Sequence, residues 1–292
     1  MYGTITGNNI TPAYKVRTLG DVINLTNQSG DYAYSMTGQL QKRFSDNFEG
    51  QLAYTYGHSY DVASLTSSVA YSNFQFGRSV KGDIHAKDVT VSKFDSPHRI
   101  IAHGTYTFPS KTDVSFIFTG ESGTPFEFVY GGDMNGDGSS NNDLIYVPTD
   151  ARVATEIAFA QNGTLTPAVQ AVAFEEFITA NECLNSQRGT IMNRNTCRTP
   201  WAKRLDVDIR QALPTVRGQN FLVQLDIFNF LNLLNRNWGA QDLGSSNSPG
   251  ILSRASFAGA DGVYRFNPSF RQFSTQNVSS NYSLQLQLKY TF

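Results

Sequence analysis

The last eleven residues of the chain, 282–292, alternate strictly between apolar and polar side chains. This period of two places one kind of side chain on each face of a β-strand. A run of about 9 to 11 residues is also the length at which a tilted strand crosses a membrane. The pattern therefore predicts a transmembrane strand with a lipid-facing side. That side carries Tyr282, Leu284, Leu286, Leu288, Tyr290 and Phe292.

The composition fits strands better than helices as the membrane-crossing elements. Charged residues make up 16% of the 292 residues and aromatic residues 13%, but the mean hydropathy is only −0.32. A membrane helix needs roughly 20 consecutive apolar residues, and no segment approaches that length. Transmembrane strands are apolar only at every second position, so the mean hydropathy stays low.

The same alternation recurs in pairs of segments separated by short turns. Each pair has the length and spacing of a hairpin of membrane-crossing strands. The pairs are 32–44 with 48–60, 100–108 with 114–118, and 205–213 with 221–227.

Short turns alternate with long connections, which we expect at about 61–96, 129–202 and 233–281. Bacterial barrels have short periplasmic turns and long extracellular loops, so Phe292 is expected at the periplasmic edge. An even number of strands would need an eighth one, which we place within 11–25. The fold class is thus all-β, an antiparallel transmembrane barrel. The loops are rich in turn-forming residues that disfavour a packed core, except for a short amphipathic helix at 167–181 expected on the outer rim of the barrel.

One loop segment begins like an EF-hand calcium loop. Oxygen-bearing side chains stand at every second position, at Asp133, Asn135 and Asp137, before a glycine. The twelfth position, however, is Leu144 instead of a glutamate, and Asp143 lies one place early. Two readings stay open: a calcium loop of another kind that uses Asp133, Asn135, Asp137 and Asp143, or a turn rich in Asn and Asp.

Cys183 and Cys197 are the only cysteines, and both fall in one predicted extracellular loop. Oxidising surroundings favour a disulfide between them, with two free thiols as the alternative. A bond closing this loop would stabilise the fold by about 3 kcal/mol.

Common catalytic signatures are missing from the sequence. It has no Gly-Xaa-Ser-Xaa-Gly elbow, phosphate loop or paired-histidine zinc motif. The net charge of −1 also indicates no nucleic-acid partner. We therefore expect a protein that is not an enzyme and requires no cofactor, calcium being the one candidate ion.

Several motifs resemble the C-terminal part of TonB-dependent outer-membrane receptors, above all the Oar-like branch, which carries a carboxypeptidase-regulatory-like domain. The segment Asp226-Ile227-Phe228-Asn229-Phe230-Leu231-Asn232 is similar to the pattern of their penultimate strand. The segments 123–126, 133–138, 142–148 and 194–201 resemble Oar-like loop sequences.

The resemblance implies that residues 1–292 form about the last third of a barrel of about 22 strands around a plug. Such a receptor imports a scarce ligand with energy from the TonB system, and its loops contribute to ligand capture. The implied partners are outer-membrane lipid, the remainder of the receptor with its plug, and the TonB system. Barrel-assembly machinery is expected to recognise the terminal strand, whose last residue is Phe292.

The plug and the TonB box lie outside the match, and residues 1–4 do not begin a secretory signal. We therefore expect this chain to be part of a longer or processed polypeptide. The alternative is a small independent outer-membrane barrel with a structural or adhesive role. The sequence names no transported ligand.

Overall fold

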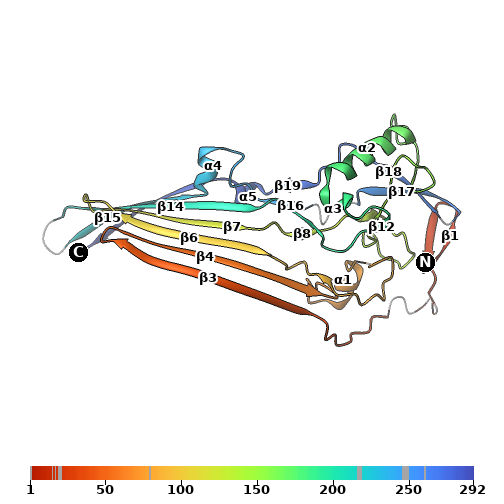
Figure 1. Cartoon of the computed structure of the whole chain (residues 1–292), viewed down its shortest axis with the longest axis horizontal. Coiled ribbons are helices and arrows are strands. Elements are labelled where there is room, and N and C mark those ends of the chain that lie inside the picture. The colour runs from red at the N-terminus through yellow and green to blue at the C-terminus, as the bar shows by residue number, and fades with distance from the viewer. Residues whose placement is uncertain are drawn as a thin grey trace.

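A computed structural model of the chain describes residues 2–14, 16, 18, 22–78, 80–215, 219–244, 250–259 and 261–292. Within these residues, seven long strands form one antiparallel sheet in which each strand lies beside its neighbours in sequence (Figure 1). All seven correspond to segments that the alternating patterns predict. They are β3 (Tyr32–Ser45), β4 (Phe48–Asp61), β6 (His98–Thr107), β7 (Thr112–Glu121), β14 (Ala202–Leu213), β15 (Asn220–Phe228) and β20 (Ser283–Thr291), and the short β5 (Thr90–Val91) pairs with the end of β4. Of the predicted residues, Phe108 lies just outside β6, and Tyr282 and Phe292 lie just outside β20.

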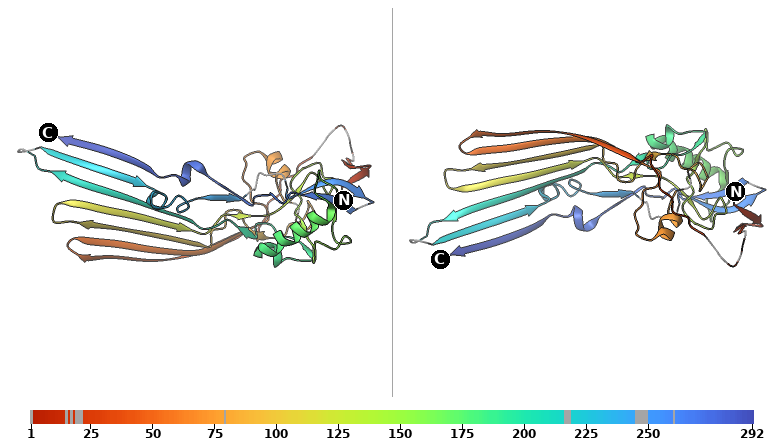
Figure 2. Two further views of the ribbon diagram at one scale, coloured as in Figure 1. Left: turned by 90° about the horizontal axis from the view of Figure 1, so that it is seen from above. Right: turned by 90° about the horizontal axis from the view of Figure 1, so that it is seen from below.

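The connections differ between the two ends of this sheet. At one end, which we call the turn end, residues 46–47, 108–111 and 214–219 connect neighbouring strands. At the other, the loop end, the connections are 62–97, 122–201 and 229–282. Most of the described parts of these long connections, together with the described N-terminal residues, gather beyond the strand ends into one body, which we call the loop domain (Figure 2).

The prediction of an eighth membrane strand within 11–25 is wrong for the residues that the structure describes. β1 (Gly3–Thr6) and β2 (Asn9–Pro12) instead pair with each other at the loop end. Between 13 and 25 the described residues contain no strand, while 15, 17 and 19–21 lie outside the described residues. The physical reason is that Pro12 has no amide hydrogen to continue a ladder and that the segment after it lacks a sustained alternation.

The odd number of long strands has a geometric consequence. In an antiparallel order of seven, β3 and β20 run in the same direction at opposite edges of the sheet. Among the described residues, neither edge carries a further strand on its outer side. The sheet is therefore open in this chain (Figure 2).

The loop domain consists of short strand pairs and helices. A four-stranded sheet joins β11 (Ala158–Phe159), β18 (Asp261–Phe266), β17 (Leu252–Ala258) and β9 (Tyr130–Gly131). The two-stranded sheets are β8 (Pro125–Phe126) with β13 (Cys197–Arg198), β10 (Tyr146–Val147) with β12 (Thr190–Ile191), and β16 (Asp242–Gly244) with β19 (Phe273–Thr275). The helices are α1 (Ala70–Gln75), α2 (Pro167–Ala180), α3 (Glu182–Asn185), α4 (Phe230–Leu234) and α5 (Asn277–Ser280).

A hydrophobic core lies inside the loop domain, which corrects the expectation that these loops would disfavour one. Phe174, Ile178, Leu252 and Phe266 are all buried there, and the Phe174 and Phe266 rings lie 5.1 Å apart. The apolar residues of this core are sparse along each loop and come together only in the folded chain. The overall polarity of the loop sequences therefore does not indicate that these loops form a hydrophobic core.

Helix α2 confirms the helix predicted at 167–181 but not its predicted place. Its N-cap Thr166 accepts a hydrogen bond from Val169 N, and Pro167 occupies the first turn, where its missing N–H costs nothing. The helix packs against β11 and β18 and buries Phe174. On its outer side, Val169 and Val172 remain 49% and 47% exposed. It is a core helix of the loop domain.

Candidate functional site

One face of the seven-stranded sheet is mainly apolar, although Lys42 on β3 and Lys203 on β14 also lie on it. Residues paired across antiparallel strands share a face, so cross-strand registers define each row. One such row pairs Phe116 with Val207, Val207 with Ile227, and Ile227 with Leu284. A neighbouring row contains Ala102, Phe118 and Leu205. These rows unite the separately predicted apolar sides of the strands into one surface.

Much of this apolar surface is exposed. Leu286 on β20 is 65% exposed, and Met36, Leu40 and Leu52 are also exposed. A water-facing surface rarely leaves so broad a contiguous apolar area uncovered, because its hydration is unfavourable. The face is thus suited to an apolar surrounding.

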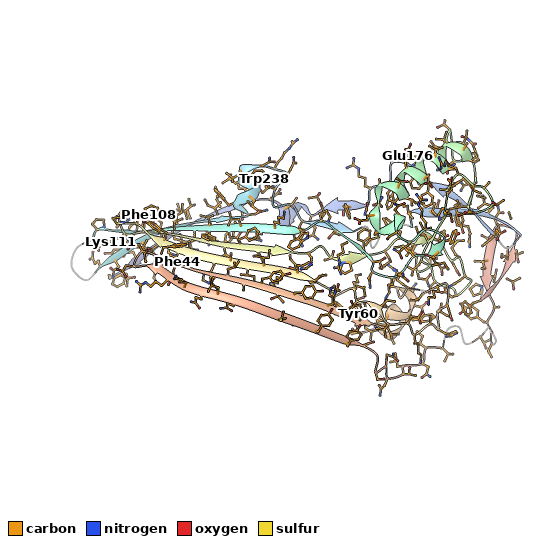
Figure 3. All side chains as sticks on the ribbon, viewed as in Figure 1. Phe44, Tyr60, Phe108, Lys111, Glu176 and Trp238 are labelled. Atoms are coloured by element: carbon orange, nitrogen blue, oxygen red, sulfur yellow. A yellow bond between two sulfur atoms is a disulfide. The ribbon has the colours of Figure 1, made fainter. Side chains whose placement is uncertain are left out.

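Aromatic ring pairs form a band at each end of the apolar face. Figure 3 labels Phe44 and Phe108 near the turn end and Tyr60 near the loop end. At the loop end, the Tyr32 and Tyr60 rings stack with centroids 4.9 Å apart, and the His98 ring stacks on Trp201 at 5.9 Å. The band at the turn end includes the ring pairs Phe44–Phe48, Tyr106–Phe108 and Phe221–Tyr290. Two aromatic bands that flank an aliphatic zone are the pattern of transmembrane barrels at the two membrane interfaces.

The predicted terminal strand takes its place at one edge of this face. β20 pairs with β15 as expected, with Leu284, Leu286 and Leu288 opposite Ile227, Leu225 and Val223. The predicted assembly residues Tyr282 and Phe292 flank the strand, and both are exposed. The apolar residues of the predicted assembly signal thus lie together on the apolar face.

The opposite face of the sheet is mainly polar and hydrogen-bonded across strands, although Ile101 and Ile117 also lie on it. Thr37 Oγ1 lies 2.8 Å from Thr55 Oγ1, and Gln51 Oε1 lies 3.1 Å from His103 Nε2. Near β20, Gln287 Nε2 donates to Asp226 Oδ2 at 3.1 Å. Such a face suits water and polar solutes, so the sheet separates two kinds of surroundings.

Two arginines fasten the loop domain to the end of β4. Arg194 is buried and donates to Asp61 O and Oδ1, both at 2.6 Å, and to Val62 O at 2.8 Å. Arg198 forms an ion pair with Asp95. Asp95 is buried and also accepts a hydrogen bond from Ser59 N at 2.7 Å. A buried charge that loses its partner costs about 3 to 5 kcal/mol, so these contacts hold the loop domain firmly.

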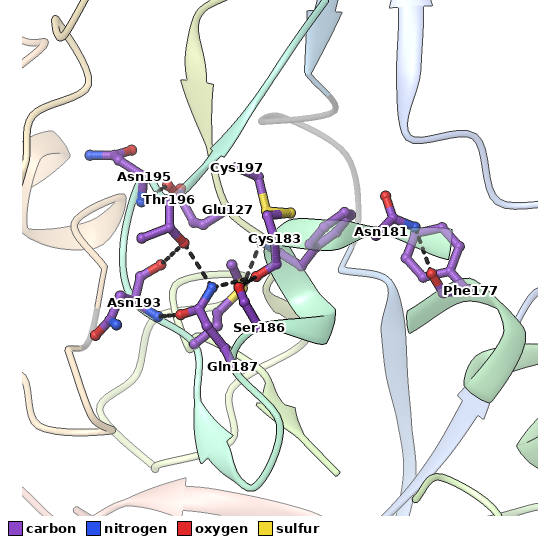
Figure 4. The surroundings of a disulfide bond; sticks show 12 residues. Glu127, Phe177, Asn181, Cys183, Ser186, Gln187, Asn193, Asn195, Thr196 and Cys197 are labelled. Atoms are coloured by element: carbon purple, nitrogen blue, oxygen red, sulfur yellow. Dashed lines mark hydrogen bonds between the residues drawn. A yellow bond between two sulfur atoms is a disulfide. The ribbon is translucent and has the colours of Figure 1, made fainter. Parts of the chain in front are cut away.

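The structure joins Cys183 and Cys197 in the predicted disulfide (Figure 4). Their Cα atoms are 5.3 Å apart, and the bond connects α3 to β13. Gln187 supports the closed loop: its Nε2 donates to Cys183 O at 2.6 Å and to Thr196 Oγ1 at 3.0 Å. The disulfide therefore sits beside the segment that carries the two arginines.

The segment 133–143, for which the sequence leaves open a calcium loop or a turn rich in Asn and Asp, folds into a turn closed by its own hydrogen bonds. Asp133 Oδ1 and Oδ2 accept from Gly136 N at 2.6 Å and Gly138 N at 3.0 Å. Both glycines have positive φ, at 80° and 87°, where a side chain would be strained. Asp137 Oδ2 accepts from the side-chain amides of Asn135 at 3.1 Å and Asn142 at 2.8 Å.

Asp143 differs from the other carboxylates of this segment. Its side chain is only 4% exposed, its Oδ2 accepts from Met134 N at 2.8 Å, and its Oδ1 has no hydrogen-bond partner. Burial raises the pKa of Asp143 to about 6, and burial also raises the pKa of Asp133. In the described part of the chain, no group of three or more His, Cys, Asp or Glu side chains is arranged to hold a metal ion. Calcium binding here stays a prediction.

The arginine contacts are functional features that the sequence did not predict. Arg194 and Asp61 are 133 positions apart, and no local pattern connects an arginine in one loop with an aspartate at the end of a distant strand. Arg194 was noted only as part of a family-like loop segment. The fold alone brings these side chains together.

Comparisons with known proteins agree with the two-faced sheet. No curated protein and no solved structure matches the chain. None of the helices in the described residues is long and apolar enough to span a membrane. The sequence model of a family described as "Outer membrane beta barrel domain" matches residues 2–273, and the chain therefore belongs to this family of outer-membrane β-barrel domains.

Proposed function

We propose that the chain is a barrel segment of a TonB-dependent receptor of the Oar-like branch, which imports a scarce ligand across the bacterial outer membrane. The observation that carries this proposal is the open, odd-numbered sheet. Because β3 and β20 run in the same direction, joining them directly would make a parallel contact in an otherwise antiparallel sheet. An odd number of further strands would close the barrel with antiparallel pairs throughout.

The family-like segment 226–232 and the two different faces of the sheet support the same proposal. Asn229, in the family-like segment 226–232, is buried and in left-handed conformation, and its Nδ2 donates to Gly239 O at 3.0 Å and Ser280 O at 2.8 Å. The segment thus holds together the loop between β15 and β20. The apolar face would meet lipid and the polar face the lumen, with the loop domain outside the cell and Phe292 at the periplasmic edge.

In this arrangement the loop domain would contribute to ligand capture, while a plug and the TonB system would supply gating and energy. Barrel-assembly machinery would recognise the terminal strand. No catalytic step belongs to the proposal. The small independent barrel with an adhesive role is the competing function, and it requires the seven strands to close without further ones.

The reading frame around this sequence and the intact mass of the native polypeptide test the proposal. We expect a polypeptide in the outer-membrane fraction that is well above 32.3 kDa and carries a plug and a TonB box upstream of the sheet. A signal peptide directly before this sequence and a stop codon directly after it would contradict the receptor function and favour the small barrel.

A further inference from the structure

The segment 133–143 lies at a junction of the loop domain. Asn135 O accepts a hydrogen bond from Tyr2 N at 2.5 Å, next to the β1–β2 hairpin. Asp133 O accepts one from Arg254 of β17, and Asp143 O accepts one from Tyr130 N of β9 at 2.9 Å. An ion bound here would therefore act on three parts of the loop domain together.

Asp143 places an oxygen in this junction that lacks a donor. Its Oδ1 is buried with no hydrogen-bond partner, and no ion pair among the described residues involves Asp143. Burying an ionised carboxylate is costly unless a cation or hydrogen bonds compensate it. Burial raises the pKa of Asp143 most, and the nearby carboxylates of Asp137 and Asp133 raise it further, whereas the main-chain N–H groups of Met134 and Asn135 lower it.

We propose that this junction binds one calcium ion, with Asp143 Oδ1 as its buried ligand. Calcium takes six to eight oxygen ligands in flexible geometry, including amide and main-chain oxygens. Asn135 and Asn142 donate their side-chain Nδ2 groups to Asp137 Oδ2, so these three side chains lie in one hydrogen-bonded group. In the proposed site, Asp137 and the amide oxygens of Asn135 and Asn142 would turn toward the ion and join Asp143 Oδ1 in a mixed donor set. This set needs no third acidic side chain, so it accords with the absence of a three-acid cluster from the described residues.

Two carboxylates and neutral oxygens make a weak site. Calcium affinity decreases when fewer of the ligands are charged, and extracellular modules reach dissociation constants of about 10⁻⁴ to 10⁻³ M. We expect a value in that range for this junction. The inference is independent of the transported ligand, and it would hold for a receptor segment and for an adhesive barrel alike.

Terbium luminescence on the purified chain in detergent, with calcium chloride as competitor, tests the site. Tyrosine sensitises bound terbium at short range, and the stacked rings of Tyr130 and Tyr264, with centroids 4.9 Å apart, neighbour Asp143. We expect saturable luminescence that calcium displaces. Asp143→Asn, which keeps the shape but removes the charge, should weaken calcium competition at least about tenfold. Asp150→Asn is the matched control, because it changes a carboxylate that is paired with Arg152. It should leave the competition of calcium with terbium unchanged.

Asp137→Asn provides a second variant if Asp143→Asn does not fold, and it should also weaken binding. Hydrogen exchange of peptide 133–143 in the unmodified chain gives a readout without substitution: calcium should slow it relative to chelator. The proposal is overturned if calcium neither displaces terbium nor slows this exchange up to about 10 mM. It is also overturned if the folded Asp143→Asn variant binds calcium like the unmodified chain.

Discussion

The sheet and the loop domain place their apolar side chains in opposite ways. On the sheet, leucines such as Leu286 point outward and are exposed, whereas in the loop domain Phe174 and Ile178 are fully buried. A strand in lipid needs its apolar side chains outside, because the surrounding solvent is hydrocarbon. A water-exposed body needs them inside. The difference indicates that one chain folds in two solvents, with the aromatic band at the loop end between them.

The largest expected effect comes from truncating the core of the loop domain. Phe174→Ala should lower its free energy of unfolding by about 3 to 5 kcal/mol, since it leaves a cavity in a packed interior. Leu286→Ala on the apolar face is the control and should cost much less, because lipid fills the space. Hydrogen exchange of peptides from each region measures both changes. Equal losses for the two variants would break the comparison.

Removing the disulfide should have the next largest effect, confined to the loop domain. The Cys183→Ser and Cys197→Ser double variant should lower the stability of that domain by about 3 kcal/mol, because the unfolded loop gains freedom. Limited proteolysis under graded urea should show earlier cleavage within 122–201. The sheet should keep its stability, and a comparable loss there would contradict two separately stabilised regions.

A charge placed on the sheet should distinguish its two faces. Leu286→Arg puts a guanidinium near the middle of β20 on the apolar face and should cost at least about 2 kcal/mol in folding into lipid vesicles. Gln287→Arg, one position further on the polar face, should be nearly neutral. Urea titrations in vesicles compare the two variants. Similar costs would mean that the faces are not exposed to different solvents.

The smallest expected effect is a pH dependence in the loop domain. Burial raises the pKa of Glu175, but hydrogen bonds from Arg188 and Ala151 N outweigh it, so the pKa lies below its usual value. A depressed carboxyl pKa stabilises the folded state above the unfolded value of about 4.3, and this contribution is lost as the pH falls through the folded pKa. Thermal unfolding of the loop domain, measured between pH 6 and pH 3, should show that its stability decreases as the pH falls. In the Glu175→Gln variant this decrease should be smaller. If the stability of the variant depended on pH as steeply as that of the unmodified chain, other titratable groups would cause the pH dependence.

Sequence patterns predicted the sheet well because alternation is local. In β20, every second residue from Leu284 to Tyr290 lies on the apolar face. The six other long strands follow the same alternation with exceptions such as Lys42 and Ile117. The predicted eighth strand failed because it rested on an expected even number and not on an alternation. The spacing of apolar residues was enough to predict the helix at 167–181. It did not predict that the helix packs against β18.

The contacts of the loop domain are a different case, since they join distant residues. The core unites Phe126 and Ile145 of the connection 122–201 with Phe266 of the connection 229–282, and the Arg194 contact with Asp61 spans 133 positions. The disulfide was predictable because the chain has only two cysteines. The buried oxygen of Asp143 was not, because burial depends on all the segments that meet at the junction.

A scan of labels along β20 tests most directly that one face of the sheet meets lipid. Single cysteines at 284, 285, 286, 287 and 288 would carry a fluorophore in vesicles with nitroxide-labelled lipid, while the native cysteines remain paired in the disulfide. We predict strong quenching at 284, 286 and 288 and weak quenching at 285 and 287. Uniform quenching, or quenching in the opposite phase, would contradict the account.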